Sequence, residues 1–288
     1  MIQNLTIDAI AKYIEENIEI KKIDIEELVS YTGYSRRHLQ KICKDKLGFP
    51  IGKYIQLRRI TRAAALLTLS DLPISSISAR LCYDSQQTFT REFKKNTGYT
   101  PLQYRNNKVL DFPDMIGYRD TNSIFSPPKV YHVDKMVIDG FLFKYKEKIP
   151  YTGEVSELRL KEIKKWFENY IYISSKISSS NISNNEIIIS GVIWTDAEKA
   201  NIQLEIQSGY YACFSFTGSQ EEYSRFNYHI YMNLFPFYKL SKRDDFDIEI
   251  ISRENDLLFN FQYYIPVMKN ENIVLSYDKS PFPLIYAD

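Results

Sequence analysis

The chain repeats one helix-turn-helix pattern, and this repeat limits the folds open to it more than any other feature. When Ser35 is set against Ser85, the segment GYSRRHLQKICKDKLG aligns with CYDSQQTFTREFKKNTG, and Gly48 falls on Gly98. The apolar positions of the two segments coincide as well. A helix-turn-helix unit that occurs twice predicts an all-α domain built from two similar halves.

The second copy, Ile74–Arg105, predicts a short helix, a tight turn and a second helix. Asp84 and Ser85 are candidate N-caps, because their side-chain oxygens can accept the unpaired N–H groups of a first helical turn. Phe89 and Phe93 are four residues apart and are expected to face a core. The other side carries Gln86, Gln87, Thr90, Arg91 and Lys94. Glutamine can bond adenine, arginine can bond guanine and the threonine methyl can contact thymine, so this face suits a major groove. The alternative for any single helix is an ordinary solvated face.

The first copy has the same organisation. Ile25–Thr32 is the predicted support helix, Gly33 suits a left-handed position after it, and Ser35 can cap the next helix. On that helix Leu39, Ile42 and Cys43 are expected to point inward. The outward positions are polar and mostly basic: Arg36, Arg37, Gln40, Lys41 and Lys44.

The segment Ile51–Ser70 between the copies is predicted to be one helix. About twenty residues give a length of roughly 30 Å, close to the ~34 Å between major-groove segments one turn apart. One chain could therefore place two recognition helices on DNA without dimerising. Arg58, Arg59 and Arg62 on this helix have two interpretations: solvated charges, or contacts to phosphate or RNA polymerase.

At these residues the chain resembles the AraC/XylS family. PISSISARLCYDSQQTFTREFKKNTGYTPLQYR is similar to the second half of that family's DNA-binding domain and GYSRRHLQKICKDKLG to the first half, over about Asn4–Asn106. The resemblance implies base contacts by Arg37, Gln40 and Lys41 in the first helix and by Gln86, Gln87, Thr90 and Arg91 in the second. Close relatives often have Trp in place of Arg37 and Arg in place of Lys41, so the first half is expected to prefer a different sequence. The domain comes first in the chain, as in the Rob-type branch, where a gyrase-inhibitor-like ligand-binding domain follows.

The charge of the chain is divided unevenly. Residues 1–105 contain 17 Lys and Arg against 11 Asp and Glu, a net charge of +6, and the other 183 residues contain 20 and 25, a net charge of −5. A basic first part agrees with phosphate binding through counterion release.

Length and residue content indicate two folded domains without membrane or metal chemistry. The 288 residues are 44% hydrophobic and 15% aromatic, enough for packed cores. There is no basic-plus-apolar signal segment and no apolar run near the ~18 residues of a spanning helix, so we expect a cytoplasmic protein without membrane contact. Cys43, Cys82 and Cys213 are expected to be reduced thiols. No His or Cys pair has ligand spacing, so neither a metal nor a cofactor is expected.

The pattern changes after the helical part, and we predict three segments: a DNA-binding domain at 1–108, a linker at 109–128 and an α+β domain at 129–288. The linker contains Pro113, Pro127 and Pro128. Strands are predicted at Val130–Lys148 (broken near Asp139-Gly140), Ile187–Trp194, Ile202–Ile206, Gly209–Thr217, Phe246–Ser252 and Leu257–Val267. Helices are predicted at Val155–Ile173 and Gln220–Phe235, with a loop at Lys176–Asn185. The order is β-α-β-β, twice. Nothing in the sequence accounts for the tail 268–288.

This second pattern resembles the gyrase-inhibitor-like fold, with GYYACFSFTG, FDIEII and YYIPV at the places where that family has strands. The resemblance implies a hollow that binds a small amphipathic or cationic ligand, with Glu249 as the acidic residue and Asp247 as second candidate. The alternative is that both carboxylates are solvent-facing charges on an edge strand. Trp166, Trp194, Tyr211 and Phe216 are candidate walls, and the alternative is that they fill the core.

Together these patterns predict a sequence-specific transcription regulator, expected to be an activator, that binds promoter DNA as a monomer. The resemblance implies contact with RNA polymerase, a ligand-sensing second domain, and stress or multidrug-resistance genes as targets. The runner-up is an architectural DNA-binding protein or repressor whose second domain binds only protein partners. No nucleophile motif, P-loop or dinucleotide fingerprint is present, so no enzymatic activity is expected.

Overall fold

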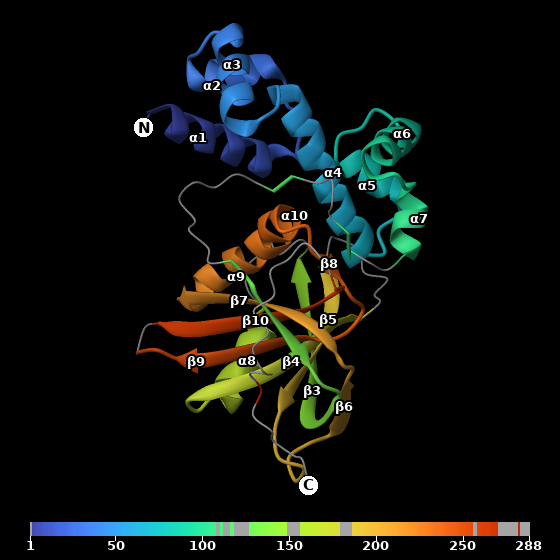
Figure 1. Ribbon diagram of the computed structural model, residues 1–288, viewed down its shortest axis with the longest axis vertical. Helices are drawn as coiled ribbons and strands as arrows, with labels where there is room; N and C mark the ends of the chain where they lie inside the picture. Colours follow the sequence, from blue (N-terminus) through green and yellow to red (C-terminus); the bar gives the residue numbers. More distant parts are fainter. Residues whose placement is uncertain are drawn as a thin grey trace.

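A computed structural model describes residues 2–107, 110–111, 116–117, 127–148, 156–178, 186–255, 258–269 and 282. Figure 1 shows a helical domain above a mixed domain built on one sheet. Most of the predicted linker 109–128 and of the tail 268–288 lies outside the described residues.

The helical domain contains both predicted copies of the helix-turn-helix. Its helices are α1 (Ile2–Asn17), α2 (Ile25–Thr32), α3 (Arg36–Leu47), α4 (Ile51–Leu69), α5 (Ile74–Arg80), α6 (Gln86–Thr97) and α7 (Pro101–Asn106). The pairs α2–α3 and α5–α6 are the two copies, and α4 joins them as one continuous helix (Figure 1). The predicted connecting helix is therefore confirmed.

The two turns show how the repeat is built. Gly33 ends α2 with φ of 71°, where a residue with a Cβ would be strained. The equivalent turn of the second copy uses Cys82, with φ of 58°. Ser35 and Ser85 cap α3 and α6, each accepting the N–H three residues on. Asp84, the other candidate cap, instead forms an exposed ion pair with Lys22, which lies between α1 and α2.

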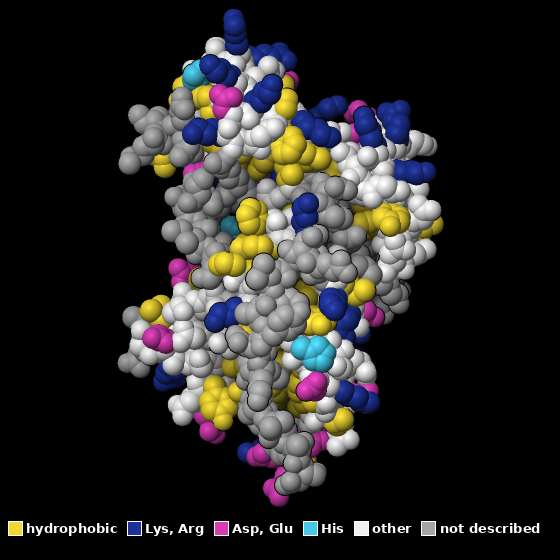
Figure 2. All heavy atoms as spheres, in the orientation of Figure 1, with side chains coloured by type: hydrophobic (Ala, Val, Ile, Leu, Met, Phe, Trp, Pro, Cys, Tyr) yellow, Lys and Arg dark blue, Asp and Glu magenta, His cyan; other side chains and the backbone are white. Residues whose placement is uncertain are grey.

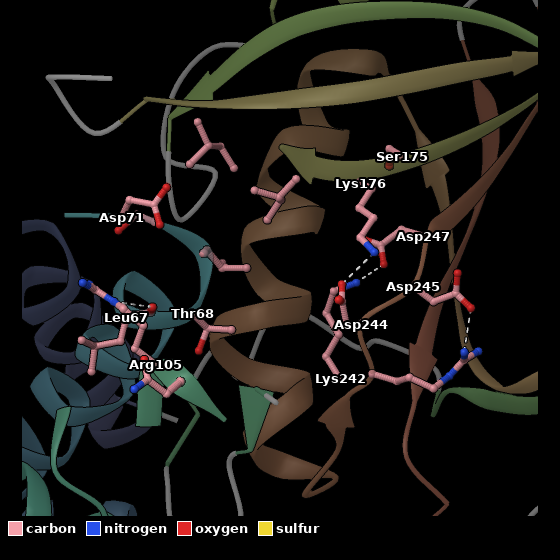
Figure 3. Close-up of a pocket in the computed structure, with 16 residues that line it drawn as sticks. Leu67, Thr68, Asp71, Arg105, Ser175, Lys176, Lys242, Asp244, Asp245 and Asp247 are labelled. Atoms are coloured by element: carbon pink, nitrogen blue, oxygen red, sulfur yellow. Dashed lines mark hydrogen bonds and ion pairs between the residues drawn. The ribbon is translucent and has the colours of Figure 1, made fainter. Parts of the chain in front are cut away.

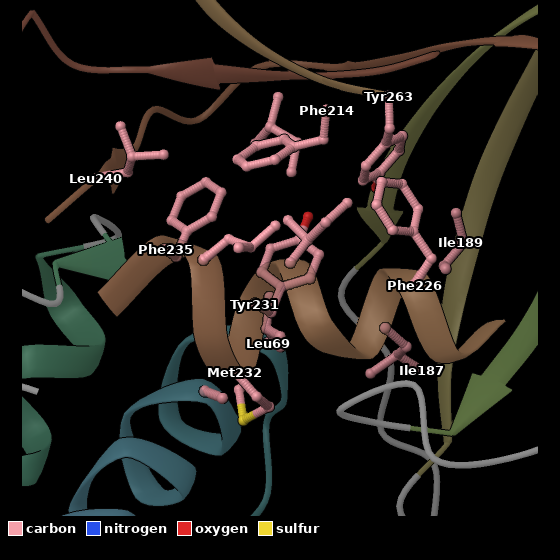
Figure 4. Close-up of a cluster of buried hydrophobic side chains, with 14 of the residues drawn as sticks. Leu69, Ile187, Ile189, Phe214, Phe226, Tyr231, Met232, Phe235, Leu240 and Tyr263 are labelled. Atoms are coloured by element: carbon pink, nitrogen blue, oxygen red, sulfur yellow. The ribbon is translucent and has the colours of Figure 1, made fainter. Parts of the chain in front are cut away.

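The two copies differ in what their apolar faces pack against. The first copy has its own core, formed by α1, α2, α3 and the first half of α4 and including Ile14, Leu39 and Tyr54. The second copy shares one continuous core with the sheet domain: Phe89, Phe93 and the second half of α4 belong to the same cluster as the sheet residues. Figure 4 shows this shared core, with Leu69 of α4 beside residues of the second domain.

The sheet domain contains eight strands longer than two residues in its described part. They are β2 (Lys129–Val133), β3 (Met136–Lys148), β4 (Tyr170–Ser178), β5 (Glu186–Trp194), β6 (Ile202–Ile206), β7 (Gly209–Gly218), β9 (Asp247–Arg253) and β10 (Phe259–Val267). All pairs are antiparallel, in the order β6-β3-β5-β4-β9-β10-β7-β2. Two short strands, β1 (Leu110–Asp111) and β8 (Ser241–Lys242), pair beside β10.

This order is a duplicated β-α-β-β arrangement. The first unit is β3, helix α8 (Glu157–Trp166), β4 and β5, and the second is β7, helix α9 (Gln220–His229), β9 and β10. The units meet where β4 pairs with β9. Each unit is preceded by a short strand that pairs with the other unit, because β2 pairs with β7 and β6 pairs with β3.

Three predicted elements of this domain are wrong in part. The helix expected over Val155–Ile173 ends at Trp166. Strand β4 begins at Tyr170, within the range expected to be helical, and it extends into the first residues of the loop predicted at Lys176–Asn185. The alternating residues YIYI satisfy a strand as well as a helix, and pairing with β5 and β9 decides in favour of the strand. Consequently Ile202–Ile206 is an outer strand rather than the last strand of the first unit.

The first long strand is also broken elsewhere than expected, at residues 134–135 between β2 and β3. Gly140 lies within β3, where a Cβ would come within 2.4 Å of a Val192 methyl group. The glycine therefore allows the close pairing of β3 and β5 instead of ending the strand.

The second predicted helix is confirmed with an irregular end. After α9 the chain forms a π-helix, η1 (Ile230–Leu234), and one short turn, α10 (Phe235–Phe237). Figure 1 places α9 and α10 between the sheet and α4. Residues of α8 and α9 such as Ile163 and Phe226 pack with Ile251 and Phe261 of the sheet, so both helices cover the same face. The other face forms a separate cluster that includes Ile248.

Candidate nucleic-acid interface and ligand site

Helix α3 presents the polar face that the sequence predicts. Leu39, Ile42 and Cys43 are buried. Arg36, Arg37, Gln40 and Lys41 are exposed, as is Lys44. Arg36 is held within its own domain, because its Nη1 lies 2.9 Å from the Glu26 Oε1 of α2. The other exposed side chains carry donors that can reach bases or phosphates.

Helix α6 is built in the same way. Phe89 and Phe93 are fully buried. Gln86, Gln87, Arg91 and Lys94 are exposed, and Thr90 is half-buried. The helix is held on α4 by two polar contacts: Lys53 Nζ donates to Asn96 Oδ1 at 2.9 Å, and Gln56 donates to Glu92. These contacts lie away from the polar face, so the groups of that face are available to a ligand.

Basic side chains gather at the end of the molecule that carries α3 and α6, away from the sheet domain (Figure 2). The helix α4 between the copies has 19 residues. Its length is roughly 28 Å, which is near the spacing of successive major grooves. The arrangement therefore matches two recognition helices on one face of DNA, with phosphates neutralised around them.

Neither interpretation of Arg58 and Arg62 is correct. Both guanidinium groups are buried, with residue exposures of 0% and 2%. Arg58 lies 2.6 Å from the Glu15 Oε1 of α1, and Arg62 donates to the same carboxylate at 3.2 Å. The pattern of charged positions along α4 could not reveal that the sheet domain covers this side of the helix. Arg59 is half-buried rather than solvated.

In the second domain, Glu249 lies in the closed interior. Its residue exposure is 3%, and its Oε2 accepts hydrogen bonds from Arg159 Nη2 and from the Tyr223 hydroxyl, each at 2.6 Å. Burial alone would lower the pKa of Arg159, but Glu249 together with Tyr145, Tyr223 and Glu147 outweighs it and raises that pKa. Burial and the neighbouring carboxylate raise the pKa of Tyr223 well above its ordinary value.

Asp247 lies on the same face of β9, also buried. It accepts hydrogen bonds from Tyr263 at 2.9 Å and Tyr231 at 3.1 Å, and it forms an ion pair with Lys242. Since β9 lies between β4 and β10, the alternative of solvent-facing charges on an edge strand is wrong. Both carboxylates are instead bound by partners from this chain.

Arg159 was not among the predicted site residues, although one signal was available. The apolar Leu158, beside it in the sequence, lies on the exposed side of α8. Arg159 and Ile163, four residues apart, are the buried positions of this helix. The i, i+4 spacing from Ile163 pointed to an inward arginine, which in turn requires a buried acid.

The four aromatic candidates are divided among three places. Trp166 and Trp194 line one cavity of about 350 Å³ together with Tyr172, and the rings of Tyr172 and Trp194 stack at 5.1 Å. Tyr211 is fully buried in the core of the opposite sheet face. Phe216 stacks on a phenylalanine of α9 at 5.0 Å, within the shared core. Only the two tryptophans therefore share a cavity.

That cavity also has an acidic side. Asp139, Glu168 and Asp196 line it, with Lys199 as the basic residue. Trp194 Nε1 donates to Ser174 at 2.8 Å, whereas the Nε1 of Trp166 is buried without a hydrogen-bond acceptor. Aromatic walls with nearby carboxylates suit an aromatic or cationic molecule.

A second cavity of about 510 Å³ lies between the domains (Figure 3). Leu67, Thr68 and Arg105 line it from the helical domain, and Asp247 lines it from the sheet domain. Its charged groups are largely paired with one another, as in the 2.9 Å contact between Lys176 and Asp244.

The described residues contain no cluster of three His, Cys, Asp or Glu side chains able to hold a metal ion. Within the same part of the chain, no helix combines the length and apolar content needed to cross a bilayer.

Comparison with known proteins gives consistent matches. The helix-turn-helix domain family matches residues 28–107. The F1 operon positive regulatory protein of Yersinia pestis is 41% identical over 271 residues, which are 93% of this chain and 89% of that protein. The HTH-type transcriptional activator AarP of Providencia stuartii is 34% identical over 103 residues, 36% of this chain and 76% of that protein. The right origin-binding protein of Escherichia coli (strain K12) is 43% identical over 83 residues, 29% of each chain.

Proposed function

The chain belongs to the AraC/XylS family of transcriptional regulators, as a Rob-like member, and from this premise we propose that it activates transcription as a monomer bound to two adjacent major grooves. The observation that carries the proposal is the pair of capped helices, α3 and α6, with exposed polar faces at the two ends of one rigid helix. Two recognition elements within one chain make a second chain unnecessary for contact with two half-sites.

In this proposal the base contacts come from Arg37, Gln40 and Lys41 on α3, and on α6 from Gln86, Gln87, Thr90 and Arg91. The flexible lysines Lys44 and Lys94 contact phosphates. Arg36 contributes less to base recognition, since Glu26 already holds its guanidinium. Activation is supported by the names of two relatives, a positive regulatory protein and a transcriptional activator. Contact with RNA polymerase stays a prediction from the family resemblance. Stress or multidrug-resistance genes as targets stay a prediction from the family resemblance.

Selection of bound sites from random DNA with the full chain tests this function. We expect one asymmetric site that spans two major grooves and binds one protein per duplex. A palindrome bound by two chains would refute the monomeric arrangement. The absence of any enriched site would favour the architectural alternative, and an enriched site that lowers transcription from a linked promoter would favour a repressor.

For the second domain, we propose that the cavity between Trp166 and Trp194 senses a small amphipathic or cationic molecule. The aromatic walls and the three carboxylates support this place over Glu249, whose oxygen already has two donors. A gyrase-inhibitor-like origin of the domain agrees with its duplicated β-α-β-β order.

Benzyltrimethylammonium, an aromatic cation, is a suitable first probe. A ligand at one hundred times its Kd stabilises the folded state by about 2.7 kcal/mol, so the melting temperature is expected to rise with concentration. Trp194→Leu is expected to abolish the rise, and Phe216→Leu, outside the cavity, is expected to preserve it. A rise that survives Trp194→Leu would place the ligand elsewhere, and no rise with the unmodified chain would refute a cation site here.

A further inference from the structure

The first copy of the helix-turn-helix is attached to the rest of the molecule in an unusual way. Its apolar core is separate, whereas the second copy shares the core of the sheet domain. Contact between the first copy and the sheet domain is instead made by a buried polar group that we call the interdomain cluster: Glu15, Arg58, Arg62 and Tyr228. Its members come from three elements: Glu15 from α1, Arg58 and Arg62 from α4, and Tyr228 from α9.

Glu15 of α1 is the centre of the interdomain cluster. Arg58 bonds both carboxylate oxygens, at 2.6 and 3.0 Å, and Arg62 approaches the Oε2 at 3.2 Å. The Tyr228 hydroxyl of α9 donates to the same Oε2 at 2.6 Å and accepts from Arg62 at 2.8 Å. Burial would raise the pKa of Glu15, but the two arginines lower it to about 2.

The same arginines extend the contacts in two directions. Arg58 Nη1 donates to the Met232 carbonyl oxygen of η1 at 3.0 Å, which satisfies an acceptor in a π-helix. Arg62 Nη1 lies 3.0 Å from Glu19, in the turn that follows α1, and Glu19 pairs with Arg80 of α5. The cluster therefore touches both copies of the helix-turn-helix and the sheet domain at once.

From this geometry we infer that Tyr228 is a positioning residue that fixes the first recognition helix, α3, relative to the second, α6, through Glu15 and the α4 arginines. It is the one cluster member from the sheet domain, and its hydroxyl bonds Glu15 of α1, so the orientation of α1 is fixed relative to α9. Two half-sites are then read at one fixed spacing, because the short ion pairs and hydrogen bonds among these four side chains hold the angle between the copies. The inference rests on the proposed function for its DNA readout.

Helix α9 and η1 offer a matched control. Tyr231 is fully buried whereas Tyr228 is half-buried, and the Tyr231 hydroxyl also donates to a carboxylate, that of Asp247 at 3.1 Å, but both of these residues belong to the sheet domain. Tyr228→Phe and Tyr231→Phe thus remove the same group with a similar loss of stability. Only the first change affects the contact between domains.

The experiment uses the full chain and the selected site with its two half-sites moved apart or together by one base pair. The unmodified chain is expected to lose affinity sharply at both altered spacings. In Tyr228→Phe we expect the ratio of the affinity at the best spacing to the affinity at the altered spacings to fall about fivefold or more, as for a lost coupling between sites. Tyr231→Phe is expected to keep the original ratio.

A second measurement does not depend on DNA. Nitroxide labels at Asp45 of α3 and Lys95 of α6, with Cys82 replaced by serine, report the distance between the recognition helices. Tyr228→Phe is expected to broaden that distance distribution, and Tyr231→Phe to leave it unchanged. An unchanged distribution and an unchanged spacing ratio in Tyr228→Phe would overturn the inference, as would equal effects of the two variants. If no two-groove site exists, the proposed function fails while the distance measurement still decides the role of Tyr228.

Discussion

The ion pair between Arg159 and Glu249 gives the sharpest prediction about the second domain. Their side chains are 6% and 4% exposed and their charged atoms are 2.6 Å apart. Arg159→Met would leave the Glu249 carboxylate buried, where the neutral Tyr223 hydroxyl still donates to it. Removing one partner of a buried ion pair costs about 3–5 kcal/mol in the free energy of unfolding, because the other charge stays in an apolar surrounding.

The double variant Arg159→Met/Glu249→Gln separates this effect from ordinary packing loss. It removes both charges, and the amide oxygen can still accept from Tyr223. We therefore expect the double variant to regain most of the lost stability, so that its free energy of unfolding is only about 1 kcal/mol below that of the unmodified chain. Lys161→Met, on the exposed side of α8, is the control and should change stability by less than about 0.5 kcal/mol.

The assay is denaturant unfolding followed by tryptophan fluorescence. Both tryptophans of the chain, Trp166 and Trp194, lie in the sheet domain, so the signal reports this domain alone. A loss below about 1 kcal/mol for Arg159→Met would refute the reasoning. It would mean that water reaches Glu249, and the ligand hollow expected from the sequence would again be the better interpretation.

Four further predictions follow from the helical domain. Arg91→Ala is expected to lose about 1–3 kcal/mol of binding free energy on the selected site and to relax specificity at one base, which binding titrations on single-base variants of the site will measure. An equal loss of affinity on random DNA would exclude a base contact by Arg91. Lys94→Ala is expected to weaken all sequences alike and to lower the slope of log affinity against log salt; an unchanged slope removes it from the phosphate contacts. Because the left-handed backbone costs a residue with a Cβ about 1 kcal/mol, Gly33→Ala should lower the melting temperature and Cys82→Gly should not. The pKa of Glu15 is about 2 against an ordinary 4.5, so the ionised carboxylate stabilises the fold above pH 4.5. That contribution, about 3 kcal/mol, is expected to disappear as the pH falls from 4.5 toward 2 in an acid titration, and the loss should be smaller in Tyr228→Phe.

The helical domain was predictable because its determinants are local. Ser35 and Ser85 cap helices through bonds to residues three positions away, and Gly33 adopts the backbone that its lack of a Cβ allows. The exposed faces of α3 and α6 follow from the 3.6-residue period, since Leu39 and Phe89 fix which side is buried. None of these features depends on the second domain.

The predicted ligand site shows where such reasoning ends. The positions of Glu249 and Asp247 on one face of a strand were predicted, because side chains alternate along β9. Their partners come from elsewhere in the chain, as Arg159 does from α8, and no local pattern specifies those pairings. Strand β4 was missed for the same reason, since pairing with β5 and β9, rather than its own residues, decides its conformation.

The two copies of the helix-turn-helix are alike in sequence and yet differ in how firmly each is attached. Phe93 of the second copy belongs to a core that continues through Leu69 into the sheet domain, so a shift of α6 against that domain would open apolar contacts over a wide area. The first copy meets the sheet domain through the directional bonds of Glu15 with Tyr228 and two arginines. A buried ion pair with short hydrogen bonds likewise has one favourable geometry. The shared apolar core therefore holds the second copy on the sheet domain, and the charged contact sets the angle of the first copy against both.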